Sequence, residues 1–400
     1  MPGFEIFGAE EKREILDVLD TGVLFRYEFN DQRNGVYKVK EFEEKFAQYC
    51  GSAYGQAVTS GTAALKVALT AMGVGPGDEV ITQGFTFVAT WEAVLETGAI
   101  PVFTEVDGSL NMDPEDLIKK IGPKTKCIIP VHMLGAQAKI EDIVKIADQH
   151  NIPVLEDTAQ AAGGRIRGRH LGTFGRCGTF SFDSVKTITT GEGGMIITDD
   201  EELWRTMSEY QDHGHDHKVN PGARGGEGRR FIGFNYRMME LQGAIGLAQL
   251  AKLDSIVASQ QKNKSILKEA ASAIPGVRFR ELVDEEGDSA TFLTFTMEDR
   301  NHCVKVNDKL KLEGFGAINF AENSWHFYPK WEHLLEGKSS VASGYPFADA
   351  GGKRRIVYDP ENLPQSTALL ERTLVYPVSI KMSEKQLSDM SGALKKAAAV

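Results

Sequence analysis

Short apolar stretches alternate with amphipathic ones through the first 200 residues, and this alternation limits the possible folds more than any other feature of the chain. The apolar stretches are almost continuous in Val, Ile and Phe, which is typical of strands covered on both faces of a parallel sheet. We predict strands at residues 78–82, 101–106, 127–131, 153–155, 178–182 and 195–198. Strands and helices in alternation indicate an α/β domain with a mostly parallel sheet.

The rest of the chain follows a different pattern. A helical pattern runs from Tyr236 to about Ile274, and short strands, a helix and a loop-rich stretch follow Pro275. We therefore predict two domains: a large α/β domain with its N-terminal segment at residues 1–250, and a smaller α+β domain at residues 251–400. One long helix is expected to connect them.

The charge balance narrows the class of function. The chain has 45 basic and 56 acidic residues, which give a net charge of −11. An acidic chain repels phosphate backbones, which argues against a general nucleic-acid-binding or membrane-binding role and leaves room for a local basic pocket. The contents of 42% apolar and 25% charged residues are those of an ordinary globular protein, which excludes the collagen, coiled-coil and disordered classes.

The cysteines form no recognisable motif. Cys50, Cys127, Cys177 and Cys303 lie at least 50 residues apart, so we predict reduced, buried thiols and neither a zinc ribbon nor a disulfide framework. The N-terminus carries charges where a signal peptide is apolar, and no apolar stretch approaches the ~20 residues that cross a bilayer. We expect a soluble, cytoplasmic protein.

Two motifs in the predicted large domain favour a flat, phosphorylated ligand. Ser60, Gly61 and Thr62 open a helix whose first N–H groups suit a phosphate, although the same residues also serve as a simple helix cap. Phe85 and Phe87 follow a predicted strand. An aromatic ring in that place either stacks on a flat ligand or fills the core.

Two further motifs supply ionisable groups. The stretch VLEDTAQ places Glu156, Asp157 and Gln160 at the carboxyl end of a strand, where ligands of parallel sheets gather, although an aspartate there can also cap the next helix. Lys186 follows Ser181 in a polar turn between two buried strands, before a glycine-rich stretch. A lysine amine in such a turn can form a Schiff base with an aldehyde.

Together the four motifs match the needs of one cofactor, pyridoxal 5'-phosphate (PLP): a helix N-terminus for the phosphate, an aromatic ring to stack, an acid for the ring nitrogen and a lysine for the aldehyde. The sequence also resembles the DegT/DnrJ/EryC1/StrS family of sugar aminotransferases. The resemblance covers about residues 36–260, through TSGTAALKVAL, GDEVITQGFTFVAT, IIPVHMLGA, VLEDTAQAAGG, GTFSFDSVKTITTGEGGMIITDD and GFNYRMMELQGAIGLAQL. The last third resembles the family only through HFYP (326–329) and LVYPVS (374–379).

The resemblance implies an aspartate-aminotransferase-like fold of PLP fold type I, PLP as cofactor, and catalytic roles for Lys186 and Asp157. Lys186 would bind the cofactor covalently and move protons, and Asp157 would keep the ring nitrogen protonated. The other cofactor-binding residues that it implies are Gly61, Thr62, Phe87 (with Phe85 as second choice), Gln160, Ser181 and Asn235. Asn235 would reach the cofactor of the neighbouring subunit in a homodimer with shared active sites.

The resemblance also implies a reaction. Some relatives carry a histidine in place of the lysine and are sugar dehydratases, so Lys186 favours amino transfer. The expected reaction is ping-pong, with glutamate as amino donor and a keto- or aldehydo-sugar as acceptor. A non-catalytic regulator with the same fold is the alternative from another class, and the intact pair of Lys186 and Asp157 argues against it.

Two polar runs allow rival interpretations. DHGHDH at 212–217 has the residues of a transition-metal site, but Gly214 favours a loop and we expect no metal. GARGGEGRR at 222–230 resembles an RGG-type nucleic-acid segment. A single copy in an acidic chain instead favours a glycine-rich loop near the substrate.

Basic residues near the implied sugar site suggest an acidic substrate. An N-terminal segment close to where the family's sugar enters contains Arg26, Arg33 and Lys38. Arginine binds carboxylates bidentately. Gln83 and Gly84 stand where the family usually has Pro-Ser, which is expected to widen the space beside the cofactor or loosen the loop.

Within the family, the whole sequence looks most like the aminotransferases that act on an acidic sugar of lipopolysaccharide, and this resemblance implies amination at C8 of a 3-deoxy-octulosonate. A nucleotide-linked 4-keto or 3-keto hexose is the alternative substrate. The candidate substrate-binding residues are Arg26, His215, Arg224, Arg229, Arg230 and His326.

Overall fold

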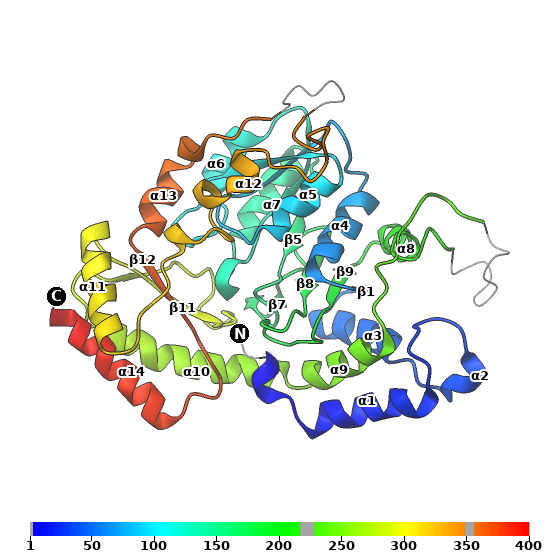
Figure 1. The fold of residues 1–400 in the computed structure, drawn as a ribbon, viewed down its shortest axis with the longest axis horizontal. Helices are drawn as coiled ribbons and strands as arrows, with labels where there is room; N and C mark the ends of the chain where they lie inside the picture. Colours follow the sequence, from blue (N-terminus) through cyan, green and yellow to red (C-terminus); the bar gives the residue numbers. More distant parts are fainter. Residues whose placement is uncertain (1–2, 217–227, 349–355, 400) are drawn as a thin grey trace.

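A large sheet flanked by helices forms the centre of the molecule, and a smaller sheet lies toward the C-terminus (Figure 1). The computed structural model describes residues 3–216, 228–348 and 356–399. The strands are β1 (Tyr54–Val58), β2 (Glu79–Gln83), β3 (Ile100–Thr104), β4 (Thr125–Ile129), β5 (Leu155–Asp157), β6 (Arg165–Ile166), β7 (Arg169–His170), β8 (Cys177–Ser181), β9 (Gly194–Thr198), β10 (Arg278–Phe279), β11 (Phe292–Thr296) and β12 (Thr373–Pro377). The α-helices are α1 (Ala9–Thr21), α2 (Asn30–Arg33), α3 (Lys38–Cys50), α4 (Gly61–Ala71), α5 (Ala89–Glu96), α6 (Pro114–Lys120), α7 (Ile140–Gln149), α8 (Glu201–Tyr210), α9 (Glu240–Leu250), α10 (Leu253–Ala271), α11 (Arg300–Leu312), α12 (Glu332–Leu335), α13 (Pro364–Leu370) and α14 (Glu384–Lys396).

The large sheet has the strand order β3-β2-β4-β5-β8-β9-β1. Parallel backbone bridges at Ile128–Val154 and Val131–Asp157 join β4 to β5, so two hydrogen-bonded groups of strands continue as one sheet. Neighbouring strands are parallel except β9, which is antiparallel to both β8 and β1. The mostly parallel α/β class predicted from the sequence is confirmed.

The six predicted strands are all present, with their ends shifted by one or two residues. In β5 the strand runs from Leu155 to Asp157 and not from residue 153 to 155. The shift places Asp157 in the last position of the strand. Strand β1 was not predicted, because its sequence YGQAV contains a glycine and a glutamine and has no apolar run.

Helices cover both faces of this sheet, which explains the almost continuous apolar strands. In β1, Ala57 packs into a cluster with α3 and α9, whereas the next residue, Val58, packs into a cluster with α4 and α8. In β9, Ile197 packs into the cluster with α3 and α9, and Ile196 packs into the cluster with α4 and α8. Side chains alternate along a strand, so each face of the sheet receives its own core.

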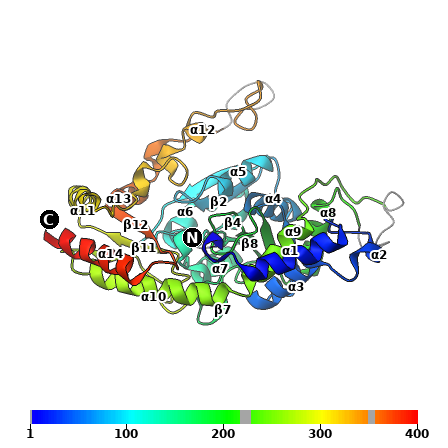
Figure 2. The same ribbon diagram turned by 60° about the horizontal axis from the view of Figure 1, so that its bottom comes forward.

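The C-terminal part contains the antiparallel sheet β10-β11-β12, which packs with α10, α11 and α14. Helices α9 and α10 follow one another along one side of the molecule (Figure 2). Residues 251–252 separate them, so the helical stretch predicted from Tyr236 to about Ile274 forms two helices, of which α10 is the long one. Lys252 at this break donates to the Glu11 carboxylate of α1 at 2.7 Å, which joins the break to α1. α9 packs on α1 and α3, and α10 packs on α14. The division at residues 250 and 251 stays a prediction.

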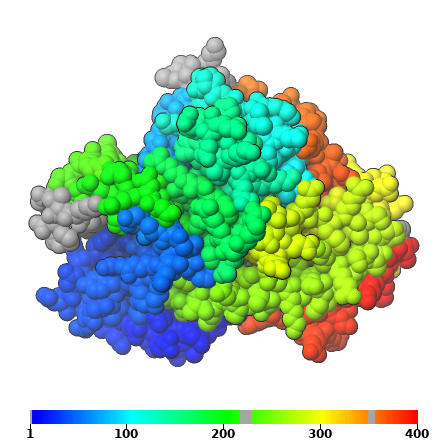
Figure 3. Space-filling model, turned by 180° about the vertical axis from the view of Figure 1, so that it is seen from behind, coloured from blue at the N-terminus to red at the C-terminus, as the bar shows by residue number. Residues whose placement is uncertain are grey.

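Seen from behind, the surface of α10 lies between the N-terminal segment and the C-terminal helix, which occupy opposite ends of the molecule (Figure 3). Within the described residues, no helix combines the length and the apolarity needed to cross a membrane.

Candidate active site

Asp157 ends β5 at the carboxyl edge of the large sheet, where only 4% of its surface is exposed. Its Oδ2 accepts a hydrogen bond from Thr90 Oγ1 at 2.8 Å, and its Oδ1 accepts one from the Ala159 N–H at 3.1 Å. Burial raises the pKa of Asp157, and these two donors and the nearby charge of Lys186 oppose that rise. The carboxylate is therefore placed to pair with a cation brought into the site.

The neighbouring acid, Glu156, has a structural role. Its Oε1 accepts from the N–H groups of Phe174 at 2.6 Å and Gly175 at 2.7 Å. Its Oε2 accepts from the Gly172 N–H at 2.8 Å and lies 3.0 Å from His132 Nε2. Successive strand residues face opposite ways, so Glu156 holds this loop while Asp157 is left for the site.

Lys186 lies in the turn after β8, near Asp157. Burial lowers the pKa of its amine, and the negative charges of Asp157 and Asp183 oppose that shift. A lysine with a lowered pKa is more often unprotonated and therefore nucleophilic. The N-terminal segment braces the turn, because the Gly3 N–H donates to the Lys186 carbonyl at 2.9 Å.

The start of α4 forms an anion site together with the end of β8. Ser60 caps the helix, since its Oγ accepts from the Ala63 N–H at 3.0 Å. Gly61 lies so close to Ser181 that a Cβ on the glycine would come within 2.7 Å of the Ser181 Cβ. The exposed Thr62 follows in the first turn. Helix N–H groups and hydroxyls thus converge on one place, which is the arrangement that binds a phosphate.

The structure separates the roles of the two phenylalanines. Phe85 is fully buried and packs edge-on against Phe320, with ring centroids 5.4 Å apart, so it belongs to the core. Phe87 is half-buried, and its ring lies 5.3 Å from that of His326 and 5.8 Å from that of Trp325. Phe87 is therefore the ring that can stack on a ligand.

Gln160 and His326 complete the set that the structure brings together. Gln160 Oε1 accepts from the Leu134 N–H at 2.9 Å, so its amide nitrogen is the end that would donate to a ligand. Asn323 Oδ1 lies 2.9 Å from His326 Nδ1, and an amide oxygen only accepts, so the proton of the neutral ring sits on Nδ1. Burial and the positive charge of Lys186 lower the pKa of His326 to about 4.

This lowered pKa predicts a dependence of stability on pH. In the unfolded chain a histidine has a pKa of about 6.5. Between that pH and about pH 4 the unfolded chain therefore binds more protons than the folded chain. The free energy of unfolding should fall as the pH falls through this window. His326→Gln should reduce this slope in urea unfolding of the cofactor-free protein at pH 5 and 7.5. The exposed His150→Gln is the control. Equal slopes in wild type and His326→Gln would contradict the burial of this ring.

The three cations that suggested an acidic substrate are held in internal ion pairs. Nη2 of Arg26 donates to both carboxylate oxygens of Glu43 at 2.8 Å, and the arginine side chain is only 6% exposed. Arg33 is fully buried against Glu240 at 2.8 Å. Lys38 donates to Glu14 at 2.7 Å and Asp17 at 2.8 Å. These pairs remove the basis on which the sequence suggested a substrate carboxylate.

The pair Gln83-Gly84 does not widen or loosen the site. Gln83 is fully buried, and its amide donates to the Phe85 carbonyl at 2.8 Å and accepts from the Met112 N–H at 3.0 Å. Beside Gly84, Leu363 fills the space that a Cβ would need, at 2.1 Å. The expectation of a wider site or a looser loop is therefore wrong, because the hydrogen bonds of the Gln83 side chain hold the turn that the family's proline would otherwise stiffen.

The other predicted substrate residues lie after α8. His215 is buried and joined to Arg229 by an antiparallel backbone bridge. The exposed Arg230 pairs with Glu202 at 2.8 Å. Arg224 lies outside the described residues, and a role for any of these residues in substrate binding stays a prediction.

The acids of the DHGHDH run are engaged by arginines. Asp212 pairs with Arg237, and Asp216 Oδ2 pairs with Arg205 at 2.8 Å. His217 lies outside the described residues. In the part of the chain that the structure describes, no three His, Cys, Asp or Glu side chains are grouped to hold a metal ion.

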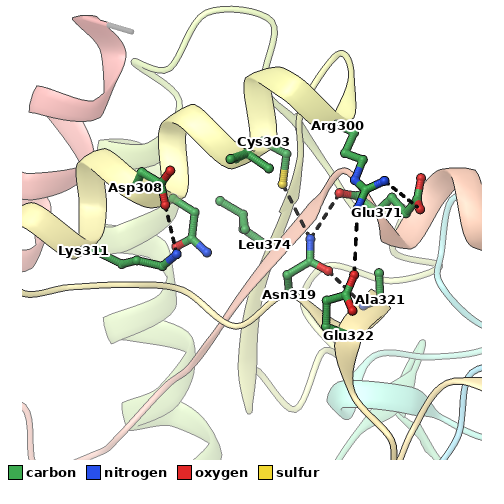
Figure 4. A pocket seen from close by; sticks show the side chains of 11 residues that line it. Arg300, Cys303, Asp308, Lys311, Asn319, Ala321, Glu322, Glu371 and Leu374 are labelled. Carbon is green, nitrogen blue, oxygen red and sulfur yellow. Dashed lines mark hydrogen bonds and ion pairs between the residues drawn. The ribbon is translucent and has the colours of Figure 1, made fainter. Parts of the chain in front are cut away.

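The four cysteines are buried and unpaired, as predicted. Cys303 lines a cavity of about 180 Å³ between α11 and the segment that contains Asn319, whose amide donates to its sulfur at 3.7 Å (Figure 4). Burial raises the pKa of Cys303 to about 11, so this thiol is protonated at neutral pH and unreactive. The predicted active-site residues do not line this cavity.

Sequence reasoning missed two threonines beside Asp157. Thr90 donates to the carboxylate, and Thr86 Oγ1 lies 2.7 Å from Thr90 Oγ1. Thr86 lies in the loop before α5 and Thr90 in its first turn, so no regular spacing in the sequence indicates that the two hydroxyls meet.

The residues fit PLP. The bare Cα of Gly61 against Ser181 leaves the helix N–H groups open to a phosphate, Asp157 suits a protonated ring nitrogen, Phe87 suits the ring face, and Lys186 suits the aldehyde. Fold and site together define a PLP-dependent aminotransferase of fold type I.

Comparisons with known proteins give the family. The sequence profile of the DegT/DnrJ/EryC1/StrS aminotransferase family matches residues 8–350, and the chain belongs to this family. Among solved structures, the aminotransferase from Psychrobacter cryohalolentis superposes with a TM-score of 0.81 at 27% identity, over 98% of this chain and 97% of that one. The 3-amino-5-hydroxybenzoic acid synthase superposes with a TM-score of 0.80, also at 27% identity, over 98% and 97%.

The similar proteins include GDP-perosamine synthases. A GDP-perosamine synthase from Caulobacter vibrioides is 43% identical over 229 residues, which are 56% of this chain and 59% of that protein. The GDP-perosamine synthase of Escherichia coli O157:H7 is 34% identical over 84% of this chain and 87% of its own. The spore coat polysaccharide biosynthesis protein SpsC of Bacillus subtilis is 32% identical over 98% and 95%.

Proposed function

We propose that this enzyme transfers an amino group from glutamate to the keto carbon of a nucleotide-linked hexose in the cytoplasm. The observation that carries the reaction type is the half-buried Lys186, whose amine has a lowered pKa and lies near the buried Asp157. The substrate class is supported by relatives named for a GDP-linked sugar. The product would be an amino sugar for a surface polysaccharide, in keeping with the name of the Bacillus relative, and lipopolysaccharide is the polysaccharide that we propose.

The geometry beside Phe87 supports a bulky substrate. An open cavity of about 510 Å³ lies there, lined by Phe87, Trp325 and His333 among others. This volume is in the usual range for small-molecule sites of roughly 300–1,000 Å³. Trp325 is 63% exposed and offers an apolar face to a sugar or a base.

An octulosonate as substrate loses its support. The charge argument for it depended on Arg26, Arg33 and Lys38, whose charges are neutralised inside the protein. The relatives that match the chain are named for a GDP-linked sugar. An unpaired substrate carboxylate in a partly buried site would cost several kcal/mol.

The site residues have distinct tasks in this reaction. When bound, PLP supplies the aldehyde that carries the amino group and a ring that withdraws electrons. Lys186 Nζ takes and returns a proton at the reacting carbon, for which its lowered pKa suits it. The charge of Asp157 would hold a proton on the ring nitrogen, and Ser181 with the start of α4 would anchor the phosphate. Phe87, whose ring lies beside that of His326, would cover one face of the ring.

A substrate panel tests the proposal. Glutamate with GDP-, UDP- and dTDP-linked keto-hexoses, and with an octulosonate that carries a carbonyl at C8, would be incubated with the PLP-loaded enzyme, and amino-sugar formation followed by mass spectrometry. A nucleotide-linked keto-hexose should react at least ~10-fold faster than the octulosonate. Faster reaction of the acidic sugar would reverse the assignment of substrate and leave that of aminotransferase intact.

We propose further that the enzyme is a homodimer with shared sites. Asn235 is exposed, and the apolar side chains of Ile232 and Phe234 beside it are 83% and 50% exposed, which is typical of a surface that a partner covers. Asn235 Oδ1 accepts from the Arg237 N–H at 3.3 Å, so its amide nitrogen is the end that would reach the neighbouring cofactor.

Mixing two inactive variants tests the shared site. In random dimers of Lys186→Ala and Asn235→Ala subunits, one site in four carries both intact groups, so about a quarter of the wild-type activity should return after subunit exchange. Differently tagged subunits would verify the exchange. Exchanged dimers no more active than their parents would place Asn235 outside the neighbour's site.

A further inference from the structure

A chain of two hydroxyl groups ends on the Asp157 carboxylate. Thr90, in the first turn of α5, has its Oγ1 2.8 Å from Asp157 Oδ2, and Thr86 has its Oγ1 2.7 Å from that of Thr90. Thr86 and Thr90 are 0% and 1% exposed. The Thr86 N–H donates to the His326 carbonyl at 2.9 Å, which fixes the start of the chain.

The direction of these hydrogen bonds follows from the chemistry of the groups. An ionised carboxylate only accepts, so Thr90 must spend its single proton on Asp157. The Thr90 oxygen then has only acceptor capacity left, so Thr86 must donate to it. Both protons therefore point toward the carboxylate, and each bond polarises the next.

We propose that Thr90, supported by Thr86, is a positioning residue that keeps the Asp157 carboxylate ionised and aimed at the ring nitrogen of PLP. The proposal is independent of which sugar is the substrate. Asp157 is buried, and burial favours the neutral acid, which has no charge to offer the ring. The Thr90 hydroxyl and the Ala159 N–H counter this by stabilising the charged form, one at each oxygen.

Thr90→Val tests the hydroxyl, since valine keeps the shape of threonine and lacks the donor. If Asp157 is more often neutral, the ring nitrogen is less often protonated and positively charged. The nitrogen that joins the cofactor to Lys186 then gains a proton more easily, because no positive charge on the ring opposes it. The pH midpoint of the colour change of the bound cofactor should therefore rise by at least ~0.5. We expect kcat to fall about 10–100-fold with KM changed less than ~3-fold.

Three variants separate this role from packing. Thr90→Ser restores the hydroxyl and should return kcat to within ~3-fold of wild type and the midpoint to its original pH. Thr86→Val leaves the Thr90 donor in place and should give a smaller shift in the same direction. Thr82→Val is the matched control, because Thr82 is equally buried and its hydroxyl donates to the Ile129 carbonyl at 2.9 Å. It should lower the free energy of unfolding without moving the midpoint.

Urea unfolding of the cofactor-free variants and titration with PLP accompany the spectra. A Thr90→Val enzyme that loses stability as Thr82→Val does, but keeps the wild-type midpoint and kcat, would overturn the proposal. So would a Thr90→Ser enzyme that behaves like Thr90→Val. If Thr90→Val does not fold, an unchanged midpoint in Thr86→Val decides against the proposal.

Discussion

Lys186→Ala should abolish turnover while leaving the fold intact. The residue lies in a turn after β8 and is not part of the core, so the far-ultraviolet circular dichroism spectrum should be that of the wild type. Activity should fall by about 10⁴-fold or more, because both the covalent attachment and the proton transfer are lost. The variant should still bind PLP through its phosphate and ring contacts, which titration of the cofactor-free protein would measure.

An exposed lysine provides the control for this variant. Lys145→Ala in α7 changes the same type of residue far from the site and should keep the wild-type rate. Substantial transaminase activity in Lys186→Ala would mean that the assignment of this lysine is wrong.

Asp157→Asn should slow the chemical step by about 10²–10³-fold and weaken PLP binding much less. An amide has the size of the carboxylate but no charge, so the ring nitrogen loses the partner that keeps it protonated. Single-turnover kinetics with glutamate would give the rate of this step, and equilibrium titration would give the dissociation constant of PLP.

The adjacent Glu156 offers a matched comparison with Asp157. Glu156→Gln removes an equally buried charge whose oxygens accept from Gly172, Phe174 and Gly175. We expect a loss of about 1–3 kcal/mol in the free energy of unfolding and little change in the glutamate half-reaction. If both variants slowed the half-reaction alike, Asp157 would have no special relation to the cofactor.

Local sequence patterns predicted the elements and the cofactor chemistry because both depend on short stretches. Strands β2 to β5, β8 and β9 follow from apolar runs, and the run at β5 already places Asp157 at the carboxyl edge. The Ser60 cap and the acid could each have been purely structural. The structure shows that the motifs belong to one site. Gly61 lies against Ser181, and Phe87, Lys186 and His326 share their surroundings.

Long-range partners could not be predicted, and they decided the substrate argument. Arg33 is neutralised by Glu240, which is 207 residues away in sequence. Nothing near a basic residue in the sequence indicates such a partner. The break between α9 and α10 could not be predicted either, because the apolar pattern runs on without interruption, and the contact of Lys252 with Glu11 of a distant helix has no trace in the local sequence.

The most direct test of the account is a two-step single turnover followed by absorbance. Glutamate added to the PLP-loaded enzyme should convert the bound cofactor to its amine form and release one equivalent of 2-oxoglutarate per subunit. After removal of the glutamate, a GDP-linked 4-keto hexose should restore the original spectrum and yield one equivalent of amino sugar. A cofactor that glutamate converts but that no nucleotide-linked keto-hexose restores would contradict the proposed substrate class, and a cofactor unchanged by every amino donor would contradict the reaction itself.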